Sequence, residues 1–488
     1  MAEEQPSAIP ETQTENCNTD QEDGMNLMNL TDLPDLVLVK IMSYLGFNDL
    51  YSAALTCQRM NEIMNHPAAW SKIRMDILSD TDLHNENFKT SRYLAMTERY
   101  GAYFQDLEFY YTGYCQPINL DIKDLIDKLN SKCRLKSLVI SVYFVETKQF
   151  NHANFNVYRL KEHYDAVCSL VSTCERLKSF SLRSWPARKA EPDKNEILEA
   201  LCANEHNKKL RKLHMFWPDR TEKNWVGLRT NQTKKHALVV VEHFTALTHL
   251  SLPSNMISQD LLDQLAKGNR ARLENMRVLV VFSNSDDNLQ IPRLSWGPLH
   301  RACPELEVEV VFNSRVPEFN MAQMLKSEMP VSVLYFMKYA RLGADDINAM
   351  AVKYQKTLKK FISYSDDTLD ADVALLSLVV NCTLLHTLIF YGPLNFKTVM
   401  ELAESKGKKW YQFVVKNDTI DLKAKKLDPD LVLGYDDATG QYYQADMVQW
   451  GDTDKSLKEK EERFKVMVES VTESIGRSWK PFSEPKST

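Results

Sequence analysis

A short apolar phrase recurs along most of this chain and limits the folds that the chain can adopt. The phrase is an apolar residue, two variable residues, a second apolar residue and often a third two positions further on. The copies lie about 31 residues apart on average. They are FQDLEF at Phe104, LKSLVI at Leu135, LKSFSL at Leu177, LRKLHM at Leu210, LTHLSL at Leu247, MRVLVV at Met276, LEVEVV at Leu306, VSVLYF at Val331, LKKFIS at Leu358, LHTLIF at Leu385 and WYQFVV at Trp410.

Helix-like stretches such as SQDLLDQLAKG and DVALLSLVVNC separate the copies. A strand–helix unit with a fixed leucine phrase is typical of leucine-rich repeats, which bury their leucines only when units stack. We therefore predict an α/β solenoid of leucine-rich-repeat type over residues 100–417, a horseshoe with a parallel sheet on its concave side. One copy, LEVEVV, looks damaged, because Glu309 stands where the second apolar anchor is expected.

Side chains alternate along a strand, so residues between the anchors are predicted to face the concave surface. Aromatic and aliphatic residues are frequent there, and such residues often anchor protein interfaces. This surface is our candidate substrate-binding site. An alternative is that loops or the C-terminal helix cover it, which would make its residues part of the core. The candidate residues are Phe216, Phe282, Tyr335, Met337, Tyr364 and Tyr391.

The nine cysteines contain no CxxC pair. This pattern favours reduced thiols and argues against a disulfide framework or a zinc site. Cys174, Cys303 and Cys382 each stand three residues before an anchor, where a helix is expected to turn into a strand. A small buried side chain suits that corner, so we predict a packing role for these three cysteines.

Composition excludes several classes of function. The net charge of −6 gives no basic surplus for nucleic acid. The N-terminus lacks a signal-peptide pattern, and no apolar run approaches the roughly 20 residues of a membrane span, so we expect a cytoplasmic or nuclear protein without a membrane partner. No GxSxG, GxGxxG, Walker or HExxH motif is present, and the histidines are not spaced for a metal. We predict no catalytic residues, no cofactor and no metal.

Three further segments differ from the repeats. Residues 1–28 are polar and acidic, so we predict a disordered tail. Residues 418–454 are acidic and lack periodicity, which indicates a loop-rich insertion. Residues 455–482 read as a helix that caps the open end of the solenoid, because terminal repeats need covering. The apolar face of that helix is predicted to hold Leu457, Phe464, Val468, Val471 and Ile475.

Residues 30–78 read as a small all-α unit of three helices. Pro34 suits the first position of a helix, and Gly46 is a plausible C-cap. Asp49 can cap a second helix, and a third ends before Pro67. The apolar residues of this segment outnumber the places in the interior of a 40-residue unit, so several of them are expected to pack against something else.

The segment 33–70 resembles an F-box. It has the LP pair, spaced leucines on the first helix, an Asp49-Leu50 step, a cysteine and a tryptophan after the third helix. Met60 departs from the family pattern, because many members carry tryptophan there. Irregular repeats and a tail like SIGRSWKPF also make the whole chain similar to the F-box only proteins 33 and 39.

The resemblance implies a non-catalytic substrate receptor of an SCF-type ubiquitin ligase. Its F-box would bind a Skp-type adaptor, which connects to a cullin and a RING subunit, and its repeats would recruit a protein for ubiquitin transfer. Two other readings are open: a scaffold that binds the adaptor outside any ligase, and an unrecognised enzyme. The apolar residues could also pack on the following repeats. Pro34 and Leu38 are the residues most expected to face a partner. The predicted adaptor-binding residues are Leu33, Pro34, Leu36, Leu38, Ile41, Leu45, Leu50, Cys57, Met60 and Trp70.

Overall fold

The computed structural model divides the chain into two compact units, residues 1–69 and residues 70–488. The described residues are 30–77, 86–112, 120–143, 157–183, 196–215, 234–280, 295–312, 325–338, 340–365, 368, 371–422, 435–436, 441–442 and 454–483. The predicted acidic tail, residues 1–28, lies outside them.

The described part of the first unit contains three short α-helices. They are α1 (Asp35–Met42), α2 (Phe47–Ala54) and α3 (Gln58–Met64). Apolar side chains from all three helices fill the interior, so burial of one face of each helix holds the unit together. The buried residues include Leu38, Val39, Met42, Phe47, Leu50, Ala54, Met60, Ile63 and Met64.

The ends of these helices differ from our prediction at three residues, Gly46, Asp49 and Pro34. Gly46 is the N-cap of α2 and has an extended backbone, so the expectation that it is the C-cap of the first helix is wrong. The first helix ends earlier, at Met42, and Asp49 lies inside the first turn of α2 rather than at its cap. Pro34 is the N-cap of α1, one position before the place we expected.

The second unit is built on a sheet of 12 strands in the described part of the chain. The strands follow one another in sequence order, and every neighbouring pair is parallel. They are β1 (Lys72–Ile77), β2 (Asp106–Thr112), β3 (Ser137–Tyr143), β4 (Ser179–Arg183), β5 (Lys212–His214), β6 (His249–Pro253), β7 (Asn275–Val280), β8 (Glu307–Phe312), β9 (Val331–Phe336), β10 (Lys360–Ser363), β11 (Thr387–Phe390) and β13 (Gln412–Val415).

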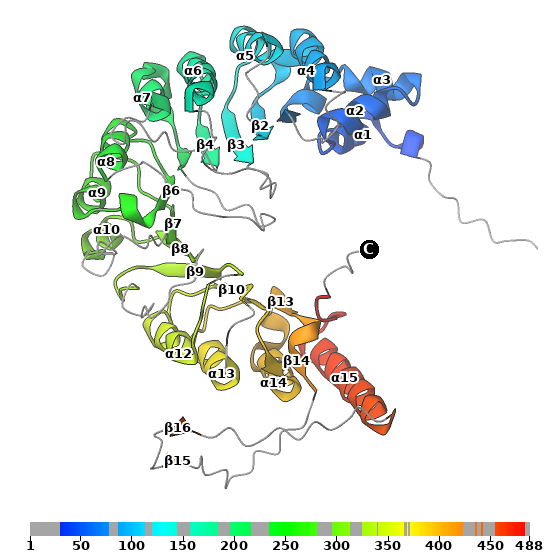
Figure 1. Cartoon of the computed structure of the whole chain (residues 1–488), viewed down its shortest axis with the longest axis vertical. Coiled ribbons are helices and arrows are strands. Elements are labelled where there is room, and N and C mark those ends of the chain that lie inside the picture. The colour runs from blue at the N-terminus through cyan, green and yellow to red at the C-terminus, as the bar shows by residue number, and fades with distance from the viewer. Residues whose placement is uncertain are drawn as a thin grey trace, which may run out of the picture. The chain divides into compact units, whose positions relative to one another are not determined.

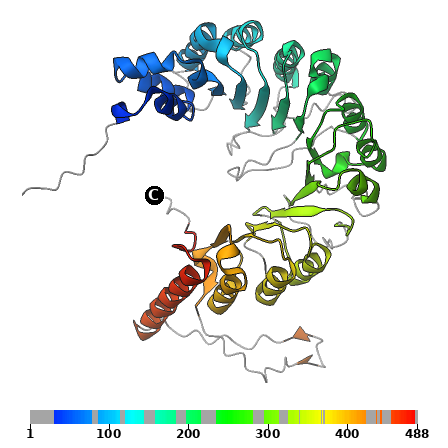
Figure 2. The same ribbon diagram turned by 180° about the vertical axis from the view of Figure 1, so that it is seen from behind.

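Helices connect these strands and lie on one face of the sheet, as Figures 1 and 2 show from two sides. The other face, which we call the inner face, carries the residues between the anchors. The connecting helices are α4 (Glu86–Tyr100), α5 (Leu120–Lys132), α6 (Val157–Thr173), α7 (Glu196–Ala203), α8 (Lys234–His243), α9 (Gln259–Leu265), α10 (Gly297–Ala302), α12 (Ala344–Lys353), α13 (Ala371–Asn381) and α14 (Phe396–Lys406).

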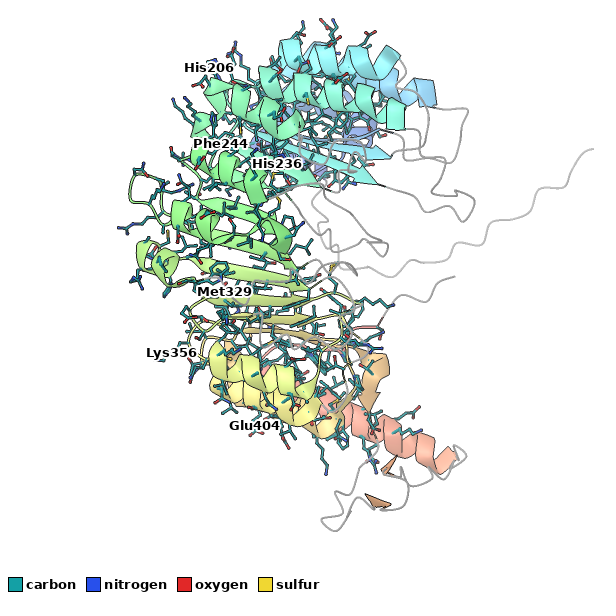
Figure 3. The ribbon with its side chains drawn as sticks, turned by 60° about the vertical axis from the view of Figure 1, so that its left-hand side comes forward. His206, His236, Phe244, Met329, Lys356 and Glu404 are labelled. Atoms are coloured by element: carbon teal, nitrogen blue, oxygen red, sulfur yellow. The ribbon has the colours of Figure 1, made fainter. Side chains whose placement is uncertain are left out.

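Most of the predicted anchors form continuous buried rows on the helix side of the sheet. In one row, Leu138, Phe180, Leu213 and Leu250 pair in register across four strands, and all four are buried. Stacking of the repeats therefore buries the leucine phrase, as the solenoid interpretation requires. Figure 3 includes Phe244 and Met329, which are buried just before strands, and Lys356 and Glu404, which are exposed.

Two copies of the phrase have a different register from the predicted one. Met276 pairs with Leu250, so the phrase of this repeat begins at Leu273 and not at Met276. Glu309 pairs with Arg277 on the inner face, so it is not a damaged anchor. The anchors of β8 are its alternate residues Val308, Val310 and Phe312.

The sheet begins earlier than we predicted. Trp70 is completely buried and belongs to the second unit, and its ring stacks on Tyr100 at 4.3 Å between centroids and on Phe104 at 6.3 Å. With Ile73 and Met75, both buried, it forms one more copy of the phrase, WSKIRM. The tryptophan therefore packs on the repeats.

The C-terminal part of the chain adds smaller elements. They are the parallel pair β12 (Leu394–Asn395) and β14 (Ile420–Asp421), the antiparallel pair β15 (Tyr435–Asp436) and β16 (Gln441–Tyr442), and the helix α15 (Asp454–Ile475). Met467, Val471 and Ile475 are buried on α15, while Phe464 and Val468 are half-buried. Most of the predicted insertion, residues 418–454, lies outside the described residues.

The three corner cysteines are buried, as predicted. Cys174, Cys303 and Cys382 each follow the last residue of a helix. Their thiols have polar contacts: Cys174 Sγ donates to the Leu170 carbonyl, and Cys303 Sγ accepts from the Leu273 amide. The packing role is confirmed.

Candidate functional site

An exposed apolar stripe runs along one face of α1. Leu36 and Tyr44 are each 76% exposed, and Val37 and Ile41 lie between them with 42% and 36% exposure. Helical spacing places Leu36, Val37 and Ile41 on one side of the helix, opposite the buried Leu38 and Met42. Tyr44 lies in the turn just after the helix, which ends at Met42. We call these four residues the α1 stripe. Exposed large apolar side chains that gather on one face are typical of a protein interaction site.

The structure divides the ten predicted adaptor-binding residues into two groups. The exposed or partly exposed residues are Leu33, Pro34, Leu36, Ile41, Leu45 and Cys57. Leu38, Leu50, Met60 and Trp70 are at most 5% exposed, and their side chains are part of the chain's own interior. The structure therefore gives these four a packing role in place of the predicted contact role, because the buried face of a short amphipathic helix is needed to hold the unit together.

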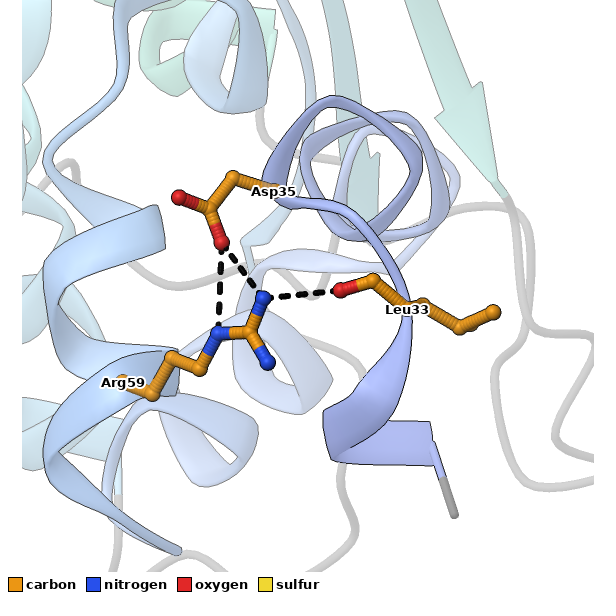
Figure 4. A network of polar contacts seen from close by, with 3 residues as sticks. All are labelled: Leu33, Asp35 and Arg59. Carbon is orange, nitrogen blue, oxygen red and sulfur yellow. Dashed lines mark hydrogen bonds and ion pairs between the residues drawn. The ribbon is translucent and has the colours of Figure 1, made fainter. Parts of the chain in front are cut away.

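Arg59 connects the start of α3 with the start of α1 (Figure 4). Its Nη2 lies 2.7 Å from Asp35 Oδ1, and its Nε donates to the same oxygen at 3.2 Å. Nη2 also donates to the carbonyl of Leu33 at 2.8 Å. The guanidinium thus holds the LP segment and the first turn of α1 against α3. Our sequence reasoning missed Arg59, since nothing in a single sequence connects residues 24 positions apart.

A cleft of 520 Å³ lies beside this contact, within the first unit. Its floor has the buried Val39 and Ile63, and its rim is polar. The cleft is lined by Asp35, Val39, Gln58, Arg59, Glu62, Ile63 and His66.

The inner face of the sheet carries a row of apolar side chains in its C-terminal half. The residues pair in register from β7 to β13, and the first five are at most 7% exposed. We call this set the inner row. It consists of Leu279, Val311, Tyr335, Ile362, Ile389 and Val414.

Three of the predicted substrate-binding residues lie next to the inner row. Met337, Tyr364 and Tyr391 are half-buried and pack against it. The rings of Tyr364 and Tyr391 meet edge to face at 4.7 Å, and Tyr335 lies 5.5 Å from Tyr364. The structure therefore brings Tyr335, Met337, Tyr364 and Tyr391 together. Phe216 and Phe282 lie outside the described residues.

The C-terminal tail supplies one more ring to this cluster. Phe482 stacks on Tyr391 with 5.3 Å between ring centroids and an interplanar angle of 19°. Its amide donates to the Val415 carbonyl, and its carbonyl accepts from the Asn417 amide, both at 2.8 Å. Part of the aromatic surface is thus covered by the chain itself, which agrees in part with the alternative that we left open. Our sequence reasoning did not assign Phe482 to this surface.

The inner face also carries polar side chains on β5 to β8, and two of these strands, β7 and β8, hold residues of the inner row as well. The ion pair between Arg277 and Glu309 is mostly shielded from solvent, with side chains 17% and 14% exposed. His214 Nδ1 lies 2.7 Å from Ser251 Oγ on the neighbouring strand. Polar and apolar side chains of this face therefore meet on β7 and β8.

Among the described residues, no group of three or more His, Cys, Asp or Glu side chains could hold a metal ion. Within the same residues, no helix has the length and apolar character needed to cross a bilayer. Burial raises the pKa of the Cys174 thiol to about 12, and burial together with the nearby Cys174 raises the pKa of Cys133 to about 12. These two thiols are protonated at neutral pH and unsuited to nucleophilic chemistry.

Comparison with known proteins agrees with the geometry of both units. Residues 30–76 match the F-box-like family model, a segment that includes α1, α2 and α3. The chain is also similar to F-box/LRR-repeat protein 21 from Bos taurus, with 24% identity over 312 residues. That match covers 64% of this chain and 65% of the relative. Residues 30–76 are therefore similar to an F-box-like domain, and the chain is similar to an F-box protein with leucine-rich repeats, while the closer likeness to the F-box only proteins 33 and 39 stays a prediction.

Proposed function

We propose that this protein is a substrate-recognition subunit of an SCF-type ubiquitin ligase. Its F-box-like domain binds a Skp-type adaptor, which connects it to a cullin and a RING subunit. Its repeats bind a protein substrate, and ubiquitin transfer itself is carried out by the other subunits. The protein has no catalytic residue and no cofactor in this role, and it acts in the cytoplasm or the nucleus.

The α1 stripe is the observation that carries this proposal. Two of its four apolar side chains have about three-quarters of their surface in solvent. Complete burial of an exposed side chain of this size contributes about 1.5–3 kcal/mol, and Leu36 and Tyr44 have the most surface left to bury. The stripe lies in the segment that matches the F-box-like family. A flat apolar adaptor surface would complement it.

The inner face of the sheet is our proposed substrate surface. The half-buried Met337, Tyr364 and Tyr391 supply aromatic and aliphatic contacts, and such side chains often dominate the binding energy of an interface. The ion pair of Arg277 and Glu309 on the same face would orient the partner. We further propose that the repeats curve into a horseshoe, which would enlarge the surface that a substrate can touch.

Recovery of the tagged full-length chain from cells tests this function. Adaptor, cullin and RING subunit should be recovered together. The variant Leu36→Asp/Tyr44→Asp should lose all three, because a charge would be buried in the adaptor contact. Its matched control is Val373→Asp, which changes an equally exposed valine on α13 and should keep them. Adaptor without cullin would instead support the ligase-independent scaffold, and recovery of neither would overturn both readings.

A further inference from the structure

Arg59 is placed to control how the α1 stripe is presented. We propose that Arg59 is a positioning residue for adaptor binding, acting through the carbonyl of Leu33 rather than by touching the adaptor. This inference rests on the proposed function, because it concerns the same F-box surface. One side chain on α3 would thus set the orientation of an exposed surface on α1.

The start of α1 lacks a side-chain cap. Its N-cap is Pro34, which offers no side-chain hydrogen bond to the first turn. Helices usually satisfy their free N-terminal amides with a capping serine, threonine or aspartate, and this helix has none at that position. The helix has only 8 residues, too few to hold its direction without tertiary contacts. The contact with Arg59 therefore carries much of the constraint on its first turn.

Two kinds of bond make up this contact, and they differ in strength. The ion pair with Asp35 joins side chains that are 40% and 72% exposed, so water and salt weaken it. The hydrogen bond to the Leu33 carbonyl, 2.8 Å long and partly buried, joins a charged donor to the backbone itself. A charge-assisted hydrogen bond to a backbone carbonyl constrains the path of the chain more firmly than a contact with an exposed carboxylate.

The position of this carbonyl explains the effect on the stripe. Leu33 lies three residues before Leu36, the first residue of the stripe. Fixing the Leu33 carbonyl fixes where the helix begins and which way it turns its exposed face. Without Arg59, the first turn of α1 would sample several orientations, and adaptor binding would have to order it. Such ordering lowers affinity without removing any contact with the adaptor.

Three variants of the full-length chain separate these bonds. Arg59→Met removes every donor but keeps an apolar stem of similar length. Asp35→Asn weakens the ion pair and leaves the Leu33 contact intact. Lys132→Met is the matched control, because Lys132 is a cation in an ion pair with Glu98 on the repeats and its side chain is also 40% exposed. The probe is a purified Skp-type adaptor, and its Kd is measured by calorimetry.

We expect Arg59→Met to raise the Kd by about tenfold, the loss expected for one charge-assisted hydrogen bond. Asp35→Asn should raise it by less than about threefold, since exposed ion pairs contribute little. Lys132→Met should leave it unchanged. Hydrogen exchange distinguishes positioning from folding. In Arg59→Met, the Leu38 amide, bonded to the Pro34 carbonyl, should exchange faster, while the Asn61 amide on α3 should keep its protection.

Three results would overturn the inference. They are an unchanged Kd for Arg59→Met, an equal loss for Asp35→Asn, and loss of protection throughout all three helices, which would reveal a purely structural role. Failure of the unaltered chain to bind the adaptor would instead refute the proposed function, so the two failures can be told apart.

Discussion

The indole Nε1 of Trp479 donates a hydrogen bond of 2.9 Å to the carbonyl of Phe413. Phe413 belongs to β13, the last strand of the sheet, whose outward carbonyls, like that of the preceding Tyr411, have no further strand of the sheet to bind among the described residues. The tail supplies donors to them in turn: Arg477 reaches the Tyr411 carbonyl, Trp479 the Phe413 carbonyl and the Phe482 amide the Val415 carbonyl. Unpaired edge strands promote association with other chains, and this tail covers one.

Substitution of Trp479 should destabilise the repeat unit. Trp479→Phe keeps most of the ring but loses the donor, which should cost about 1 kcal/mol of unfolding free energy. Trp479→Ala also leaves a cavity and should cost about 3–5 kcal/mol. Denaturant unfolding measures both. Tyr411→Phe, at a position 73% exposed, is the control and should have almost no effect. Equal stability of Trp479→Ala and the control would contradict this role for the tail.

Removal of the tail should expose the edge of the sheet. A chain that ends after Ile475 lacks all three donors to the carbonyls of Tyr411, Phe413 and Val415, so we expect it to self-associate through β13. Light scattering coupled to size-exclusion chromatography measures the mass. A chain that ends after Ser483 keeps Arg477, Trp479 and Phe482 and is the matched control. The same mass for both chains would show that the tail does not protect the edge.

Cysteine labelling should follow burial. Cys57 is exposed, while Cys174 is buried with a pKa raised to about 12 by that burial. A maleimide should therefore modify Cys57 and spare Cys174 at pH 8, because the thiolate is the reactive form. The ordinary pKa of the Cys174 thiol is 9.0, and the folded value is higher. The contribution of this thiol to the free energy of unfolding is thus fully present below pH 9, and it is lost as the pH rises from 9 to about 12. Rapid labelling of Cys174 in the folded protein, read by peptide mass spectrometry, would contradict this burial.

The inner face should matter for substrate and not for adaptor. Tyr364→Ala with Tyr391→Ala removes the edge-to-face pair and should reduce the capture of substrates. Proximity labelling with the proteasome inhibited measures capture, and adaptor co-purification should be unchanged. Tyr411→Ala, at an exposed tyrosine outside the cluster, is the control. If the double variant labels the same proteins as the unaltered chain, the substrate site lies elsewhere, for example on the loops.

The anchors were predictable because the leucine phrase has a strict spacing. Nine of its eleven copies take the predicted position, from Phe104 to Trp410. The copies at Met276 and Leu306 were misplaced because runs of valine and leucine fit two registers equally well. WSKIRM was missed because Trp70 also fits the end of an F-box. Packing against Tyr100 and Phe104 decides between these roles, and that contact lies outside the local pattern.

The candidate site was only partly predictable for a similar reason. Spacing on α1 separates Leu36 from Leu38 on the helix, but it does not say which of the two faces outward. The interior of the three-helix unit decides this, and it buries Leu38. Arg59 and Phe482 act through contacts with residues far away in the sequence, Leu33 and Tyr391. Such contacts leave no local pattern in a single chain.

Calorimetric titration of a purified Skp-type adaptor tests the central claim most directly. Leu36→Asp with Tyr44→Asp removes two apolar side chains that the adaptor would bury. Each such burial contributes about 1.5–3 kcal/mol to binding, so the affinity should fall by at least about a hundredfold. Val373→Asp with Val380→Asp changes two exposed valines of α13 and should leave the affinity unchanged. An unaltered chain that does not bind, or a stripe variant that binds as tightly as the control, would contradict the account.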